Sequence, residues 1–127
     1  IDRMAFHRAF AKRGIQNKIE VAYDGSMALD ILMGTEESPP LMRPYILILD
    51  TTLPRMDGFE LLARLRSEPS LKDTVVFVLA TSDVYRDVAE AYGRNVAGYL
   101  VKPTTPEEYS ACTMLFEAYL MSVVLPT

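Results

Sequence analysis

Residues 45–50 of the chain read Tyr-Ile-Leu-Ile-Leu-Asp, an unbroken apolar run that ends at a carboxylate. A strand without polar alternation is typical of a parallel sheet that helices cover on both faces. A second run of this kind, Val75 to Ala80, is rich in valine and is followed by Thr81. The two runs predict neighbouring buried strands, each with a polar side chain at its carboxyl end.

Segments with helical spacing alternate with strand-like segments along the rest of the chain. Expected helix boundaries include Gly14 as a C-terminal cap, Ser26 and Ser82 as N-terminal caps, Gly93 as a stop, and a capping box with proline at residues 105–108. Helices are predicted at 4–13, after Ser26, at 58–66, 83–92 and 107–124, and further strands at 18–22 and 97–101. This alternation predicts right-handed βαβ units in one α/β domain, with helices on both faces of a parallel sheet.

Composition narrows the classes of function. The chain has 127 residues, a formal net charge of −4 and scattered basic residues, which argues against direct nucleic-acid binding. Its longest apolar runs are far shorter than the ~20 residues of a membrane span. Cys112 is the single cysteine, so no internal disulfide can form and a reducing cytoplasm is expected. Its most economical role is that of a small buried apolar residue.

Three polar side chains follow the predicted buried strands. Asp50, Thr81 and Lys102 each stand just beyond an apolar strand, and the carboxyl ends of parallel strands share one edge of the sheet. Taken singly, they could be a turn or helix cap, a satisfied hydroxyl and a solvated lysine. Together they suit phosphoryl transfer, with a carboxylate nucleophile, a hydroxyl donor, a positive charge and a magnesium ion.

Four motifs give the chain a family resemblance. Residues 49–58 read Leu-Asp-Thr-Thr-Leu-Pro-Arg-Met-Asp-Gly, Thr81-Ser82 follow an apolar strand, residues 98–103 read Gly-Tyr-Leu-Val-Lys-Pro, and Asp24-Gly25 precede Ala28-Leu29. In this order and spacing they resemble the receiver domains of two-component response regulators. The 83–92 helix and the ending at 119–126 resemble the single-domain regulators that serve phytochrome-type histidine kinases.

The resemblance implies a single receiver domain over residues 1–127 with a flavodoxin-like, doubly wound parallel sheet of five strands in the order 2-1-3-4-5. Asp50 would take a phosphoryl group from a histidine kinase or phosphotransfer protein, and Asp50 and the backbone carbonyl of Thr52 would bind Mg²⁺. Thr81 would hydrogen-bond the phosphoryl group, Lys102 would pair with it, and Thr81 and Tyr99 would act as the switch. Tyr99 could equally be a half-buried strand aromatic. The resemblance implies a phosphoacceptor and not an enzyme, although such a protein phosphorylates itself and can hasten its own dephosphorylation.

The family pattern also predicts a feature that this chain does not show. It begins with an apolar strand that ends in two acidic magnesium ligands, and the chain starts just after that point; Asp2 stands where the first helix would begin. Because the first strand is central in the order 2-1-3-4-5, the strand at 18–22 is expected to lose its partner and the core its middle. We expect a segment of ~10 residues, judged from typical strand length, to precede this chain or another chain to supply the strand. Without the acidic pair the alternative is a degenerate receiver, an interaction module that is not phosphorylated.

The last helix suggests a partner surface. Tyr109, Cys112, Phe116, Tyr119 and Val123 form the expected core stripe, whereas Met114, Leu115, Ala118 and Met121 fall largely outside it, and Glu117 is the only charged residue from 111 to 125. A helix that is apolar on more than one face either lies deep in a core or meets a partner. We expect self-association or docking, with a homodimer as the first candidate, through this helix and the strand of Tyr99.

Two other functional classes share part of this pattern. Haloacid-dehalogenase enzymes also use a strand-end aspartate, a threonine, a lysine and magnesium, but they need a second aspartate where this chain has Thr52, and a cap domain. A phosphotransfer domain with a reactive histidine is helical, and His7 is better explained as a surface histidine beside Phe6.

Overall fold

The computed structural model describes residues 8, 10–12, 14, 18–51, 55–81 and 85–127. The strands β1 (Ile19–Ala22), β2 (Ile46–Thr51), β3 (Val75–Ala80) and β4 (Gly98–Val101) form one sheet in the order β1-β2-β3-β4. All three strand pairs are parallel. The helices are α2 (Gly25–Met33), α3 (Arg55–Ser67), α4 (Tyr85–Gly93) and α5 (Pro106–Ser122). None of these helices is long and apolar enough to cross a membrane.

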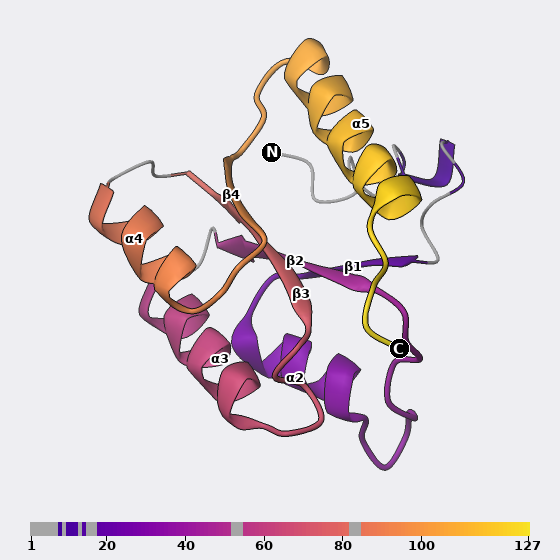
Figure 1. The fold of residues 1–127 in the computed structure, drawn as a ribbon, viewed down its shortest axis with the longest axis vertical. Coiled ribbons are helices and arrows are strands. Elements are labelled where there is room, and N and C mark those ends of the chain that lie inside the picture. The colour runs from indigo at the N-terminus through magenta and orange to yellow at the C-terminus, as the bar shows by residue number, and fades with distance from the viewer. Residues whose placement is uncertain (1–7, 9, 13, 15–17, 52–54, 82–84) are drawn as a thin grey trace.

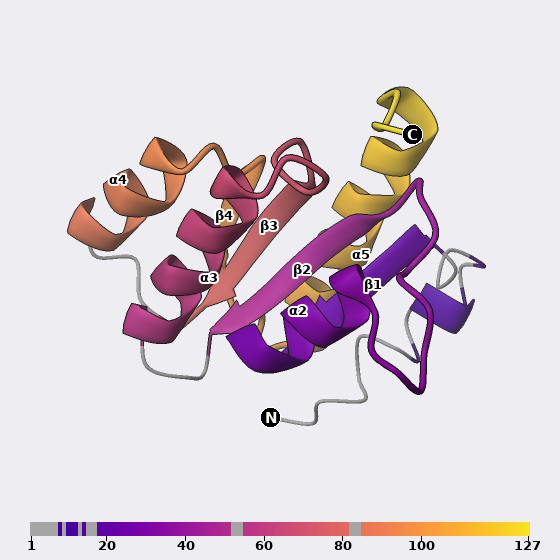
Figure 2. The same cartoon turned by 90° about the horizontal axis from the view of Figure 1, so that it is seen from below.

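Helices cover both faces of the sheet. Figure 1 shows α2, α3 and α4 on one face and α5 on the other, and the turned view of Figure 2 shows the same layers from below. The side chains of β2 alternate between the two layers: Leu47 and Leu49 join the core with α2 and α3, and Ile46 and Ile48 join the core with α5. All four are at most 2% exposed. The unbroken apolar run is therefore explained by two cores, one on each side of a parallel sheet.

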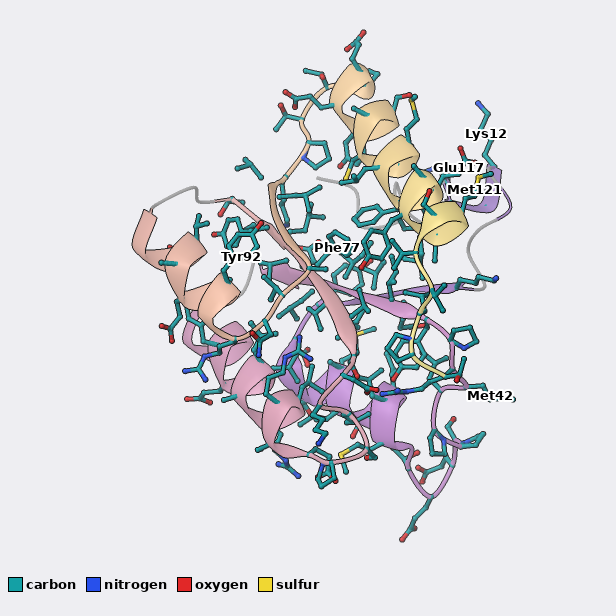
Figure 3. The ribbon with its side chains drawn as sticks, in the orientation of Figure 1. Lys12, Met42, Phe77, Tyr92, Glu117 and Met121 are labelled. Atoms are coloured by element: carbon teal, nitrogen blue, oxygen red, sulfur yellow. The ribbon has the colours of Figure 1, made fainter. Side chains whose placement is uncertain are left out.

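Aromatic side chains hold α5 against the sheet. Phe77 of β3, labelled in Figure 3, contacts two aromatic rings of α5. It packs edge to face on Phe116 and on Tyr119, with ring centroids 5.0 Å apart in both pairs. Phe10 makes a similar contact with Phe116 at 6.0 Å. Edge-to-face packing aligns the positive ring edge with the negative ring face, which stabilises the pair beyond area burial alone.

The helix boundaries agree with the sequence patterns except at some ends. Asp24, not Ser26, caps α2: an Oδ1 atom of Asp24 accepts a 2.7 Å hydrogen bond from the Met27 amide, and Ser26 already lies inside the helix. Gly93 is the last residue of α4, and the left-handed residue of the following turn is Asn95, with φ of 63°. Gly14 is left-handed as expected, with φ of 73°. The predicted cap Ser82 lies outside the described residues.

The start of α5 confirms the capping prediction with one difference. Thr105 Oγ1 accepts a hydrogen bond from the Glu108 amide at 3.1 Å, and Pro106 opens the helix. The Glu108 carboxylate also accepts from the amide and hydroxyl of Thr104, at 2.7 and 3.0 Å, one residue before the Thr105 amide of an ordinary capping box. Three donors at the start of α5 are satisfied by two side chains.

The expectation that the 18–22 strand lacks a partner is wrong. β1 pairs directly with β2, in a register that aligns Ile19 with Ile46 and Ala22 with Leu49. Removing the first strand from the order 2-1-3-4-5 leaves the observed order, so the predicted fold class is confirmed for the four strands described. The pairing has a simple cause: unpaired backbone donors and acceptors of β2 would be costly to bury, and β1 satisfies them.

At the amino-terminal edge of the sheet, one guanidinium ties two connections together. Arg66 of α3 donates hydrogen bonds of 2.8–2.9 Å to the carbonyl oxygens of Lys72, Thr74, Arg94 and Asn95. These carbonyls belong to the α3–β3 connection and to the turn between α4 and β4. Arg66 therefore ties the α3–β3 connection to the turn that follows α4.

Candidate functional site

The structure brings the side chains of Asp50 and Lys102 into contact. Nζ of Lys102 lies 2.6 Å from Oδ1 of Asp50, and the two residues are only 6% and 7% exposed. Asp50 is the second-last residue of β2, and Lys102 directly follows β4. The Lys102 amide donates to the Ala80 carbonyl at 2.7 Å, which continues the β3–β4 ladder by one residue and fixes the start of the lysine side chain.

This pair is a site of concentrated charge at the carboxyl edge of an apolar sheet. Taking a carboxylate and an ammonium out of water is costly, and the cost is met only when the two charges lie close together. The pairing leaves an oxygen nucleophile beside a positive charge. That arrangement can attack phosphorus and offset the charge of the transferred phosphoryl oxygens.

Thr81 lies at the same edge of the sheet. It directly follows β3, and the residue before it, Ala80, is aligned with Thr51 of β2 and Val101 of β4. Its side chain is exposed, so the hydroxyl is open to a ligand that approaches from solvent. The predicted carbonyl ligand Thr52 lies outside the described residues.

The described residues alone do not form a metal site. No group of three or more His, Cys, Asp or Glu side chains that could hold an ion occurs among them. At this edge Asp50 can supply one carboxylate ligand, and its Oδ1 atom is already in contact with Lys102. Mg²⁺ takes six oxygen ligands, so further ligands would have to come from elsewhere.

Tyr99 lies on the face of β4 that is turned toward α2, α3 and α4. It is half-buried and packs against the core cluster of α2, α3 and α4, whereas Leu100 packs on the α5 side. In the strand register Tyr99 is aligned with Val78, and Val78 with Leu49, so the three form a row across the sheet. Leu49 immediately precedes Asp50. Tyr99, the predicted switch residue, therefore lies on the opposite face of the sheet from the charged pair of Asp50 and Lys102.

The sequence patterns missed Asp87. This residue of α4 is 4% exposed and faces the same pocket as Tyr99, between α3, α4 and the sheet. A signal was available, because Ala91 lies four residues further along α4 and is fully buried, which places Asp87 on the inner side of the helix. An acidic residue on the buried face of a helix deserves a functional or structural explanation.

The last helix behaves largely as its pattern predicts. Cys112 and Phe116 are buried, and Tyr109 and Tyr119 are half-buried. Burial raises the pKa of the Cys112 thiol to about 11, which keeps it protonated and unreactive at neutral pH. Val123 departs from the prediction: α5 ends at Ser122, so Val123 is extended and 39% exposed.

The outer surface of α5 and β4 is apolar. Val101 and Met114 are each 54% exposed, Leu115 is 44% exposed, and Met121 near the end of α5 is 83% exposed (Figure 3). Between the strand and the helix runs a groove whose apolar lining includes Leu100, Val101, Pro103, Cys112 and Leu115, and it reaches Lys102. The groove therefore adjoins the residue that holds Asp50.

Comparisons with known protein sequences show the family of the chain. The family described as the response regulator receiver domain matches residues 2–112. The probable methanogenesis regulatory protein FilR2 of Methanothrix harundinacea is 36% identical over 105 residues, which cover 83% of this chain and 67% of that protein. The response regulator Rcp1 of a Synechocystis species is 33% identical over 113 residues, covering 88% and 77% of the two chains.

Solved structures extend the similarity to the fold. The phosphorylated cyanobacterial phytochrome response regulator RcpA matches with a TM-score of 0.80 and 29% identity, over 96% of this chain and 88% of RcpA. The Mn²⁺-bound form of Rcp1 matches with a TM-score of 0.76 and 31% identity, over 99% and 94% of the two chains. The chain is thus similar over most of its length to regulators named for phytochrome signalling.

Proposed function

Because the chain belongs to the response regulator receiver domain family, we propose that Asp50 accepts a phosphoryl group from a histidine kinase or phosphotransfer protein. The observation that carries the proposal is the 2.6 Å contact between Asp50 and Lys102 at the carboxyl edge of the sheet. It sets a carboxylate and a positive charge side by side, at the same edge of the sheet as the exposed residue Thr81.

In the proposed reaction a carboxylate oxygen of Asp50 attacks the phosphorus of a phosphohistidine. The new oxygen–phosphorus bond forms as the phosphorus–nitrogen bond breaks, and the histidine nitrogen keeps the electron pair. Lys102 then turns from the carboxylate to a phosphoryl oxygen, and the Thr81 hydroxyl donates to another. Charge-assisted hydrogen bonds of this kind are stronger than neutral ones, so the product is stabilised where it forms.

Mg²⁺ is the proposed cofactor, with Asp50 and the carbonyl of Thr52 as the ligands that this chain would supply. When bound, such an ion lowers the repulsion between the carboxylate and the incoming phosphoryl group. The Mn²⁺-bound form of Rcp1 supports a divalent ion in a relative. No step above depends on the ion, because the described residues do not form its site.

The donor proposed is a phytochrome-type histidine kinase. The printed names of two similar structures, the phytochrome response regulator RcpA and the red-light regulator RPA3017, support this assignment. We also propose a cytoplasmic location, because the single cysteine of the chain fits a reducing compartment.

A homodimer through β4 and α5 is the proposed form of the output. A two-fold axis pairs a surface with itself, and the exposed apolar residues Val101, Met114 and Leu115 form a patch that is self-complementary in chemistry. Light scattering over a range of concentrations tests this form. Met114→Lys should shift the equilibrium toward monomer, and Met42→Lys, at an exposed methionine on a different surface, should not. A monomer at all concentrations, with and without acetyl phosphate, would exclude the dimer.

The decisive experiment is incubation with acetyl phosphate and Mg²⁺ followed by intact mass measurement. The wild-type chain should gain one phosphoryl group, Asp50→Asn should gain none, and Asp30→Asn, at an exposed carboxylate of α2, should match the wild type. Lys102→Met should slow the gain.

The same experiment tests the alternative of a degenerate receiver. If the wild-type chain gains no phosphoryl group from acetyl phosphate and none from a histidine kinase, the phosphoacceptor proposal is wrong.

A further inference from the structure

One guanidinium connects two loops at the amino-terminal edge of the sheet. Arg66, in the last turn of α3, donates through Nη1 to the carbonyl oxygens of Lys72 and Thr74, at 2.9 and 2.8 Å. Through Nε and Nη2 it donates to the carbonyl oxygens of Arg94 and Asn95, at 2.8 and 2.9 Å. A guanidinium has five N–H donors in one rigid plane, and these contacts use four of them.

The four acceptors belong to connections that are distant in sequence. Lys72 and Thr74 lie between α3 and β3, whereas Arg94 and Asn95 lie between α4 and β4. The second connection is a tight turn, because both of its amides donate back to carbonyl oxygens in the last turn of α4. Asn95 is left-handed, with φ of 63°, and such a residue turns the chain away from the axis of the helix that it follows. The carbonyls of the turn are thus available to α3.

The charge of Arg66 makes these bonds depend on one another. The side chain is half-buried, and burial lowers the pKa of its guanidinium. All four hydrogen bonds go to neutral carbonyl oxygens, and bonds from a charged donor are roughly twice as strong as neutral ones. Because the donors share one rigid plane, a displacement of either connection weakens the bonds to the other.

The two ends of α4 lie at opposite edges of the sheet. β3 and β4 are parallel, so the helix that connects them runs back from the carboxyl edge to the amino edge. Its start follows Thr81, at the edge that holds Asp50 and Lys102. Its end lies at the other edge, where Arg66 binds the turn.

We propose that Arg66 joins the α3–β3 connection and the end of α4 into one cooperative unit. The two connections then open together, and α4 keeps its carboxyl end in place when its start is displaced. The regulatory use of this arrangement rests on the proposed function. A phosphoryl group on Asp50 would act on α4 at its start, so the displacement would be largest at the carboxyl edge of the sheet and smallest beside Arg66.

Native-state hydrogen exchange in low urea tests the cooperative unit without any phosphodonor. In the wild-type chain the amide of Thr74, which donates to Leu71, and the amides of Arg94 and Asn95 should share one opening free energy and one dependence on urea. Arg66→Lys keeps the positive charge but not the planar fork of donors. In this variant the two connections should open separately, and each should exchange roughly tenfold faster or more.

Two controls separate this effect from a general loss of stability. Arg64→Lys changes an exposed arginine in the same turn of α3 and should exchange like the wild type. The amides of Ala28 and Gly34, hydrogen-bonded at the two ends of α2, report a region that Arg66 does not contact. A general loss of stability would accelerate all globally exchanging amides alike, so a change confined to the two connections is specific to the proposed unit.

The second half of the proposal is read from α4 itself. In the wild-type chain the amide of Tyr92, near the carboxyl end, should be better protected than the amide of Ala89, one turn earlier. Arg66→Lys should remove this difference. Equal protection of the two amides in the wild type would show that the end of α4 is not held in place.

Different urea dependences of the two connections in the wild type would overturn the cooperative unit, and so would an Arg66→Lys chain in which they still open together. If Arg66→Lys does not fold, the wild-type measurement decides. Failure here is distinct from failure of the phosphoacceptor function. A chain that takes up phosphate while the connections open independently keeps that function and loses the unit. A chain whose connections open together but that takes up no phosphate keeps the unit and loses the function.

Discussion

Lys102→Met should destabilise the fold strongly, because it leaves the Asp50 carboxylate buried without its positive partner. At 2.6 Å and an effective dielectric constant of ~20, the attraction between the two charges is about 6 kcal/mol. The cost of burying both charges cancels part of this attraction. When Lys102 is replaced, the attraction is lost but the cost of burying the Asp50 carboxylate remains. For buried pairs the free energy of unfolding then falls by about 3–5 kcal/mol.

The partner variant should behave differently. Asp50→Asn keeps an oxygen that can accept from Lys102, and the long lysine stem can carry the ammonium toward water in a way that a carboxylate cannot, so we expect a smaller loss of about 1–2 kcal/mol. Asp50→Asn combined with Lys102→Met removes both charges, and the double variant should be more stable than Lys102→Met alone. This reversal separates an ion pair from two independent packing contacts.

Urea denaturation followed by far-ultraviolet circular dichroism is the suitable assay, because the chain has no tryptophan. The denaturation buffer contains a chelator, so that no divalent ion contributes to the charge at Asp50. Lys72→Met provides the matched control at an exposed lysine and should stay within ~0.5 kcal/mol of wild type. A Lys102→Met chain as stable as wild type, or a double variant less stable than both single variants by the sum of their losses, would refute the reasoning.

Three further predictions concern contacts away from the charged pair. Arg66→Met should lower the free energy of unfolding by about 3 kcal/mol or more in the same denaturation assay, since four carbonyl acceptors lose their donor. Burial raises the pKa of Cys112 from its ordinary 9.0 to about 11, so the folded state should lose stability as the pH rises through that interval, and melts of Cys112→Ala should lack this slope. Hydrogen bonds from the Thr104 amide and hydroxyl lower the pKa of Glu108 in the folded chain. The contribution of Glu108 to stability is therefore present above its pKa in the unfolded chain, and it is lost as the pH falls through its pKa in the folded chain. Melting of Glu108→Gln should accordingly approach that of wild type in acid.

The parts of the fold that follow from local patterns were predictable from the sequence. The apolar runs of β2 and β3 and the start of α5 depend on spacing within a few residues. The pairing of β1 with β2 does not, because it depends on which backbone lies next to which in space. The cap of α2 shows the limit at short range: Asp24 and Ser26 have equally suitable side chains, and only the extended backbone of Asp24, with φ of −157°, decides between them.

The candidate site divides in the same way. The meeting of Asp50 and Lys102 could be predicted because parallel strands end at a common edge, a rule of topology that needs no side-chain detail. Asp87 could not be connected with Tyr99, because their common pocket depends on how α4 lies against the sheet. Helix spacing indicates that Asp87 faces inward, but it does not say which residue of which strand it faces.

Any relay from Asp50 to Tyr99 has to cross the sheet, and β4 is the element suited to carry it. Successive side chains of a strand point to opposite faces. Leu100 therefore contacts the α5 layer and Tyr99 contacts the layer of α2, α3 and α4, although both belong to the same strand. In the order β1-β2-β3-β4 of the described strands, β4 lies at the end and is paired with β3 alone. A strand held on one side can shift at lower cost than β2, which is held on two. A displacement of Lys102 toward a phosphoryl group would therefore move Tyr99 and the exposed Val101 together, and so alter the pocket of Asp87 and the apolar groove of α5 in one step.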